Sequence, residues 1–240
     1  MSRGGNEEMS EIYDNARRVL DMAADAAIRS GRAAEDVMVL AASKMNGREN
    51  IREAYRAGFR LFGENRAQEL RDKLAENAYE GAEVHFIGHL QKNKLKYAVG
   101  AVSLIQSADS VELMSAISER AKLLGIRQDI LIEVNAGREP QKSGALPEAL
   151  PELLEFAAEC GGLRVAGLMT IPPNEADPEK NIRYFEKMAK LFVDIKGKKY
   201  DNVTMNILSM GMSRDFEAAI ACGANLVRVG SLVFGERQYR

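Results

Sequence analysis

The sequence predicts a single (β/α)8 barrel preceded by one extra helix. Short runs of apolar and β-branched residues alternate with longer amphipathic runs along almost the whole chain, an order typical of βαβ units around a parallel sheet. Eight such runs fit into 240 residues, which suits a small barrel of this class. The rival fold, an open doubly wound sheet, carries GxGxxG after a strand, and this sequence contains no such run. We therefore expect residues 1–240 to form one domain.

The expected elements follow one another in regular order. An amphipathic helix over Glu11–Arg29, ended by Gly31, precedes the first strand. The long irregular stretch Ala136–Pro147 is typical of a mobile loop over one barrel face. The expected strands are Val37–Ala42, Leu61–Gly63, Val84–Ile87, Val102–Gln106, Ile130–Val134, Leu163–Met169, Met205–Leu208 and Leu226–Val229. The expected helices between them include Ile51–Ala57, a charged helix ending at Ala75, Val111–Leu124, Glu179–Ile195 and Phe216–Ala221.

Composition excludes several classes of protein. The net charge is −2 and no basic stripe occurs, so the electrostatic surface of a nucleic-acid-binding protein is missing. Cys160 and Cys222 form no CxxC motif and suit a reducing compartment. Met1–Ser10 lacks the apolar core of a signal peptide, and no run approaches the roughly 18 apolar residues of a membrane helix. The histidines, His85 and His89, have no carboxylates placed with them for a metal site. We expect a cytoplasmic protein with no membrane or nucleic-acid partner.

Polar residues follow the expected strands at the barrel face where active sites form. Lys44 ends the apolar first strand, so its amine would enter the barrel mouth. A desolvated lysine becomes a nucleophile toward carbonyl groups, although a surface lysine remains the simpler alternative from position alone. The residues at the eight strand ends, in order, are Lys44, Asn65, His89, Ser107, Asn135, Thr170, Ser209 with Met210, and Arg228 with Gly230 and Ser231.

The loops after strands seven and eight predict a phosphate site. Barrels of this class often bind phosphate there, and Ser209–Ser213 and Gly230-Ser231 offer hydroxyls and glycines. Ser213 would also open a helix, whose free N–H groups favour an anion. A lysine on strand one opposite a phosphate cradle is the layout of a pyridoxal 5′-phosphate (PLP) site, with Arg228 against the pyridine nitrogen. An ion pair of Arg228 with a carboxylate, and a different phosphorylated metabolite with Lys44 as counter-ion, remain alternatives.

Six motifs in order carry a resemblance that covers the chain from about Val37 to Gly235. Together they resemble the pyridoxal phosphate homeostasis protein family. The motifs are Ala41-Ala42-Ser43-Lys44, Phe62-Gly63-Glu64-Asn65, the run from His85 to Lys94, Gly167-Leu168-Met169-Thr170-Ile171, Leu208-Ser209-Met210-Gly211-Met212-Ser213 and Val227-Arg228-Val229-Gly230-Ser231. The resemblance implies a fold similar to the N-terminal barrel of alanine racemase. It implies PLP held as a Schiff base on Lys44.

The resemblance also implies roles for the other strand-end residues. It implies phosphate contacts from Ser209, Gly230 and Ser231, with Met210 nearby. It places Arg228 toward the pyridine nitrogen and Asn65 beside the cofactor. The chain departs from the family pattern where Met45 follows the lysine in place of threonine, and where Ser231 replaces threonine with the hydroxyl retained.

The resemblance implies a PLP carrier or regulator rather than an established enzyme. Racemisation needs acid–base groups on both faces of the substrate Cα. Alanine racemases take the second group from a further domain, and we expect no room for such a domain in this chain. Its tyrosines fall at none of the strand ends. We therefore expect a non-catalytic monomer that buffers PLP or delivers it to PLP-dependent apo-enzymes. A small PLP-dependent racemase or lyase is the alternative. Lys142 on the long loop is a candidate for transient contact with PLP, although an exposed, solvated loop lysine is the simpler interpretation.

Overall fold

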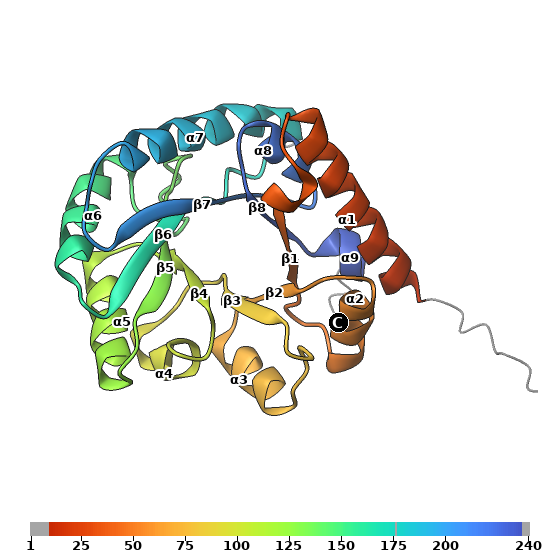
Figure 1. The fold of residues 1–240 in the computed structure, drawn as a ribbon, viewed down its shortest axis with the longest axis horizontal. Coiled ribbons are helices and arrows are strands. Elements are labelled where there is room, and N and C mark those ends of the chain that lie inside the picture. The colour runs from red at the N-terminus through yellow and green to blue at the C-terminus, as the bar shows by residue number, and fades with distance from the viewer. Residues whose placement is uncertain (1–9, 176, 237–240) are drawn as a thin grey trace, which may run out of the picture.

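The computed structural model describes residues 10–175 and 177–236, in which eight parallel strands close into one barrel surrounded by helices (Figure 1). Each strand pairs with the next along the chain, and β1 pairs with β8 to close the ring. The expected (β/α)8 barrel is therefore confirmed. The strands are β1 Met38–Ala42, β2 Leu61–Glu64, β3 Glu83–Phe86, β4 Leu104–Ala108, β5 Gln128–Glu133, β6 Leu163–Met169, β7 Val203–Met212 and β8 Leu226–Val229.

Three strands differ from the sequence-based expectation by more than an end residue, and one of them, β5, already begins at Gln128 rather than Ile130. β4 starts at Leu104 rather than Val102, because the Val102 N–H belongs to a turn and donates to the Ala98 carbonyl. β7 continues to Met212, where a turn was expected. The continuation passes a register shift between β7 and β8, and Gly211 there adopts a φ of +90°. Glycine takes that conformation without steric cost, so the strand bends and still pairs.

The extra helix before the barrel is confirmed. α1 begins after Ser10, whose hydroxyl accepts the Tyr13 N–H. It packs along the outside of the barrel against α8 and α9, as Figure 1 shows. The helices are α1 Glu11–Arg29, α2 Arg48–Arg56, α3 Ala67–Ala75, α4 Leu95–Ala98, α5 Val111–Leu123, α6 Leu150–Glu159, α7 Ile182–Lys196, α8 Phe216–Ala221 and α9 Ser231–Phe234, with 3-10 turns η1 Ala34–Asp36, η2 Lys92–Lys94, η3 Pro147–Ala149 and η4 Pro178–Asn181.

The main hydrophobic core lies between the strands and the surrounding helices, where most buried aliphatic and aromatic residues gather. Inside the barrel there are two small apolar clusters, one around Leu40 and Leu226 and one around Leu131 and Met169. Buried polar side chains fill other interior positions. A buried polar group costs free energy unless it is hydrogen-bonded, so the interior requires a defined network.

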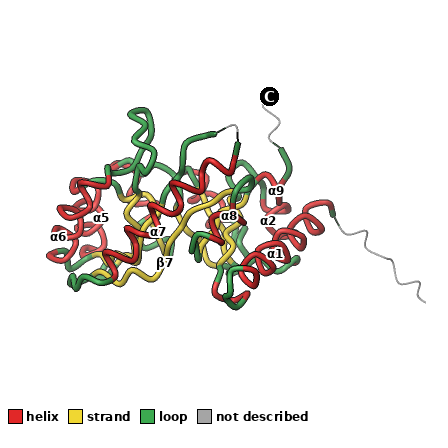
Figure 2. Tube along the Cα trace, turned by 90° about the horizontal axis from the view of Figure 1, so that it is seen from above, coloured by secondary structure: helices red, strands yellow, loops and turns green. Residues whose placement is uncertain are grey.

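The longer loops rise from one end of the barrel, which is the upper end in the side view (Figure 2). The stretch after β5, expected to be mobile, folds back on itself. The Asn135 side chain donates to the Glu139 carbonyl and accepts its N–H, while Val134 and Ala145 form a bridge. No helix among residues 10–175 and 177–236 is both long and apolar enough to cross a membrane. Residues 1–9, where a signal peptide would lie, and residues 237–240 lie outside the described residues.

Candidate functional site

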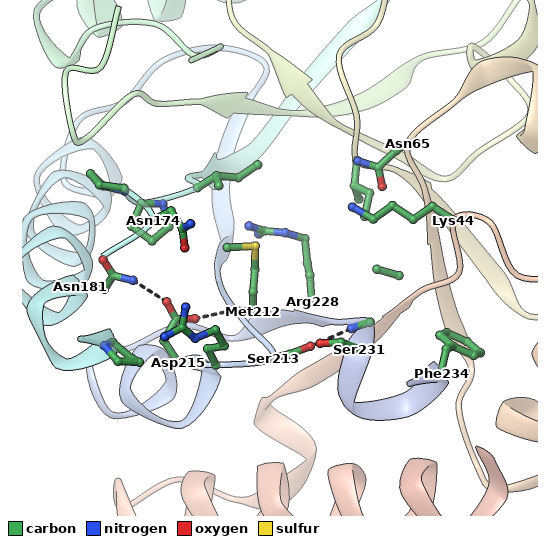
Figure 3. A pocket seen from close by; sticks show the side chains of 18 of the residues that line it. Lys44, Asn65, Asn174, Asn181, Met212, Ser213, Asp215, Arg228, Ser231 and Phe234 are labelled. Atoms are coloured by element: carbon green, nitrogen blue, oxygen red, sulfur yellow. Dashed lines mark hydrogen bonds between the residues drawn. The ribbon is translucent and has the colours of Figure 1, made fainter. Parts of the chain in front are cut away.

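A cavity of about 380 Å³ opens at the carboxyl ends of the strands. Five of the seven residues predicted from the sequence line it together: Lys44, Asn65, Arg228, Gly230 and Ser231. Figure 3 shows the side chains of Lys44, Asn65, Arg228 and Ser231 around the cavity. A volume of this size is within the range of small-molecule and cofactor pockets.

Lys44 enters the cavity from a tight turn after β1. The Asn46 N–H donates to the Ser43 carbonyl at 3.0 Å, so Lys44 and Met45 are the two central residues of a β-turn. The Lys44 side chain is half-buried and points into the cavity, close to Asn65 (Figure 3). Its amine is therefore placed to meet a ligand within the barrel mouth.

Asn65 offers an unsatisfied acceptor to that ligand. Its Oδ1 atom is buried and has no hydrogen-bond partner within the protein. Buried polar atoms are nearly always paired, so an orphaned oxygen on a cavity wall fits a site built for a donor. Gly88 fixes the position of Asn65, because a Cβ at residue 88 would lie 2.2 Å from the Asn65 carbonyl oxygen.

Arg228 is buried beneath the cavity and is held by neutral acceptors. Its guanidinium donates to the Ser209 hydroxyl at 2.6 Å and to the Thr170 carbonyl at 2.9 Å. Burial lowers the pKa of Arg228 to about 10, against the opposing effect of Glu133 and Asp215. The group therefore stays positively charged at neutral pH. No ion pair joins Arg228 to a carboxylate within the described parts of the chain, so the alternative interpretation of this residue is not supported.

Ser209 lies inside the barrel and does not line the cavity. Its hydroxyl accepts from Arg228 and donates to Gln106 Oε1 at 2.7 Å. The Gln106 amide nitrogen lies 2.9 Å from His85 Nδ1, and His85 Nε2 lies 3.1 Å from a Glu83 carboxylate oxygen. Because an amide nitrogen only donates, His85 accepts at Nδ1 and donates from Nε2. All hydrogen bonds of this network are thus donated in the same direction, starting at Arg228 and ending at Glu83.

Met210 also lies away from the cavity. It is fully buried in the core between barrel and helices. Both placements follow from the length of β7, because successive side chains of a strand alternate between its two faces. Ser209 therefore faces inward and Met210 outward. The register shift around Gly211 interrupts this alternation, and Met212 and Ser213 are the residues of this segment that reach the cavity.

Ser213, Gly230 and Ser231 form a polar corner where β7 and β8 end. The Gly230 N–H donates to the Ser213 hydroxyl at 3.1 Å, which joins the two strand ends. Ser231 is the exposed first residue of α9 (Figure 3). Behind them the buried Asp215 accepts the Met212 N–H and an N–H of the Asn181 amide, both at 2.7 Å. The corner is thus braced and presents hydroxyl groups to the cavity.

The opposite wall comes from the segments after β5 and β6. Lys142 lines the cavity, and its ammonium donates to the Pro172 carbonyl at 2.9 Å and pairs with Glu139 at 2.6 Å. The expectation of an exposed loop lysine was therefore wrong, since the side chain is half-buried and joins two loops. Asn174 and Asn181 complete this wall, and no periodic pattern in the sequence indicates them.

Other potential chemistry is limited in the described residues. No group of three or more His, Cys, Asp or Glu residues in them is arranged to hold a metal ion. None of their tyrosines lines the cavity, and Tyr79 is buried with its hydroxyl donating to Glu64 at 3.1 Å. Tyr239 lies outside the described residues.

The chain is similar to known proteins over most of its length. The alanine racemase N-terminal domain family matches residues 13–238. A pyridoxal phosphate homeostasis protein of Aquifex aeolicus is 46% identical over 222 residues, which are 92% of this chain and 96% of that protein. The chain belongs to the pyridoxal phosphate homeostasis protein family. The resemblance carried by the six sequence motifs is confirmed.

Two solved structures of similar proteins share the barrel. A protein from Bifidobacterium adolescentis matches with a TM-score of 0.88 and 36% identity, over 96% of this chain and 97% of its own. PipY of Synechococcus elongatus, solved with PLP bound, matches with a TM-score of 0.77 and 31% identity, over 94% of this chain and 100% of its own. Both are similar over nearly their entire length, so the likeness extends to the whole barrel of this family member.

Proposed function

We propose that this protein holds PLP in the cavity as a Schiff base on Lys44 and serves PLP homeostasis rather than catalysis. One observation carries the proposal: the Lys44 amine and the Ser213–Gly230–Ser231 corner lie on different sides of one cavity, with the buried oxygen of Asn65 and the cationic Arg228 also at its walls. An aldehyde at one end and a phosphate at the other match those two groups. The names of the relatives and the PLP-bound structure of PipY support the same assignment.

The phosphate contacts in this proposal are redistributed relative to the sequence-based set. Ser231 and Gly230 stay, as does the general location after strands seven and eight. Ser213 takes the place of Ser209, because the Ser213 hydroxyl reaches the cavity and the Ser209 hydroxyl is occupied by Arg228 and Gln106. Met210 contributes to the core instead.

Arg228 explains why such a site would hold PLP without strong catalysis. Bound PLP supplies an electron sink, and the sink is strongest when the pyridine nitrogen is protonated. A cation that faces this nitrogen disfavours its protonation. Arg228 keeps its charge at neutral pH and is fixed by two hydrogen bonds, so it suits that role. The tyrosines of the described residues lie away from the cavity, which further supports a carrier over a small amino-acid racemase or lyase.

The proposal also covers the cellular compartment, the oligomeric state and the recipients of PLP. Cys160 and Cys222 are both free thiols, which suits the reducing cytoplasm. We expect one domain over residues 1–240, acting as a monomer, with PLP-dependent apo-enzymes as recipients. Light scattering of the purified chain tests the monomer, and transfer of PLP to an added apo-enzyme tests delivery.

The deciding experiment is the visible absorbance of the purified protein with and without added PLP, for the wild type and Lys44→Ala. We expect a Schiff-base band in the wild type and none in the variant. Absence of a band in the wild type even with excess PLP would contradict the proposal. A band that persists in Lys44→Ala would show that PLP attaches to another lysine. Incubation with D- and L-alanine in deuterated buffer separates carrier from enzyme, since rapid loss of the α-proton would favour the racemase alternative.

A further inference from the structure

A buried cluster of charged residues touches the turn that carries Lys44. It consists of Glu64 at the end of β2, Glu69 and Lys73 on α3, and Tyr79. Glu64 is fully buried and Lys73 is 7% exposed. Lysine and glutamate are rarely so buried unless they are paired. Neither the cavity lining nor the Schiff-base chemistry accounts for this pairing.

Lys73 uses its three N–H donors on three different acceptors. They are the Ser43 carbonyl at 2.8 Å, Glu64 Oε1 at 2.7 Å and Glu69 Oε1 at 2.7 Å. An ammonium group has three donors and no acceptor, so the side chain is saturated. Burial raises the pKa of Glu64, and the opposing attraction of Lys73 and the Ser43 hydroxyl favours its ionised form.

The cluster holds the turn on the N-terminal side of Lys44. The Ser43 hydroxyl donates to Glu64 Oε1 at 2.6 Å, and the Ser43 carbonyl accepts from Lys73. That carbonyl also accepts the Asn46 N–H that closes the turn. Ser43 itself is fully buried, so both of its side-chain and main-chain anchors are shielded from water.

The cluster also holds the turn on the C-terminal side. Met45 has a φ of +64°, a conformation that residues with a Cβ rarely adopt. Met45 is 61% exposed, so packing does not impose the conformation. Its N–H donates to Glu69 Oε1 at 2.5 Å, the same oxygen that accepts from Lys73. One hydrogen-bonded unit therefore grips both neighbours of Lys44.

We propose that Glu64, Glu69 and Lys73 are positioning residues for Lys44. They hold the turn so that the Lys44 side chain enters the cavity, and saturation of the Lys73 ammonium keeps this second lysine from competing for the aldehyde. The inference rests on the proposed attachment of PLP to Lys44. It assigns a purpose to the charged α3 helix, whose residues touch no part of the cavity.

The test compares Glu69→Ala with Glu69→Gln. Both bonds of Glu69 end on Oε1, and the amide oxygen of glutamine can accept both, whereas alanine accepts neither. The Glu69 side chain is 20% exposed. Alanine and glutamine are both neutral, so neither variant puts a buried charge at this position. Glu76→Ala, an exposed carboxylate just past the same helix, is the matched control.

Two readouts are measured on each variant. The first is hydrogen exchange of the Met45 amide in the PLP-free protein, by NMR. The second is the rate at which the visible band appears after PLP is added. We expect faster exchange and at least about tenfold slower attachment in Glu69→Ala, since small displacements of a reacting group are costly. Glu69→Gln and Glu76→Ala should stay close to the wild type in both readouts.

Several outcomes would overturn the inference. If Glu69→Ala matches Glu76→Ala in both readouts, the cluster does not position the turn. If Glu69→Gln is as impaired as Glu69→Ala, the charge matters and the hydrogen-bond acceptor does not. A band in Lys44→Ala that borohydride reduction maps to Lys73 would show that Lys73 does compete. If the wild type forms no band, the proposed function fails. Exchange of the Met45 amide still decides whether Glu69 holds the turn.

Discussion

The guanidinium of Arg228 and the hydroxyl of Ser209 lie 2.6 Å apart inside the barrel, and this contact engages the Ser209 hydroxyl within the protein. The Ser209 hydroxyl in turn donates to Gln106, and the Gln106 amide donates to His85. Arg228 is thus oriented by a network that crosses the barrel interior toward Glu83 at the start of β3. Such networks fix a side chain only when each member is satisfied.

Mutation of Ser213 and mutation of Ser209 should have different effects. Ser213→Ala removes a hydroxyl from the cavity, so we expect PLP affinity to fall roughly tenfold or more, because a hydrogen bond to a charged group contributes about 1.5–3 kcal/mol. Ser209→Ala leaves Arg228 and Gln106 without a shared partner, so we expect a loss of unfolding free energy of about 1–3 kcal/mol. Inorganic phosphate as a competitor of PLP should weaken in Ser213→Ala alone. Equal sensitivity to phosphate in both variants would restore Ser209 as a phosphate contact.

Gly88→Ala should disturb the site without touching the cavity. The added Cβ would lie 2.2 Å from the Asn65 carbonyl oxygen, so the Asn65 backbone has to move. We expect a loss of unfolding free energy of about 1–3 kcal/mol, as for other overpacked sites, together with weaker PLP binding. Gly47→Ala is the control, because a Cβ there meets no atom within 4 Å. Both quantities are obtained from denaturant titrations and PLP titrations, and unchanged PLP binding in Gly88→Ala would separate Asn65 from the cofactor.

The sequence predicted the barrel and five of its cavity residues because both depend on local patterns. Alternation of apolar strands with amphipathic helices sets the fold, and the residue after a strand must lie at the barrel face. Lys44, Asn65 and Gly230 are at strand ends, but so are His89, Ser107 and Asn135, which do not line the cavity. The resemblance to the family narrowed the set. Ser209 and Met210 also lie away from the cavity, because a glycine with positive φ lets β7 continue past a register shift, which local patterns do not reveal.

Contacts between distant segments were the least predictable part of the site. The wall formed by Lys142 and the Pro172 carbonyl joins loops that follow different strands. The Lys73 cluster joins α3 to the turn after β1, and in the sequence its charges look like an ordinary solvated helix face. Burial distinguishes the two cases, and burial is a property of the assembled barrel.

Glu133 should make stability depend on pH near neutrality. Burial, with repulsion from Asp109, raises its pKa from 4.5 to about 7, against the attraction of Arg228. The folded state therefore binds a proton more tightly than the unfolded state, so stability falls as pH rises from about 4.5 to 7. The shift corresponds to roughly 3 kcal/mol. Glu133→Gln cannot titrate, so its free energy of unfolding should decline less than that of the wild type between pH 5 and pH 7.5. Parallel curves for the two proteins would contradict the raised pKa.

Lys73→Met should be strongly destabilising because it leaves the buried Glu64 without its cation. Breaking one side of a buried ion pair costs about 3–5 kcal/mol. Loss of the cation raises the pKa of Glu64 further, so the unfolding free energy should fall more at pH 8 than at pH 5, where the carboxyl group is more often protonated.

The double variant Lys73→Met with Glu64→Gln decides whether the uncompensated charge is the cause of this loss. It removes both charges at similar volume and should recover most of the stability, while Lys92→Met, an exposed lysine elsewhere, should stay within about 0.5 kcal/mol of the wild type. In the double variant no ammonium group donates to the Ser43 carbonyl. Full stability together with slow PLP attachment would therefore show that Lys73 neutralises Glu64 and positions the turn as two separate roles. A double variant as unstable as Lys73→Met would instead assign the loss to the hydrogen bonds of the turn rather than to the buried charge.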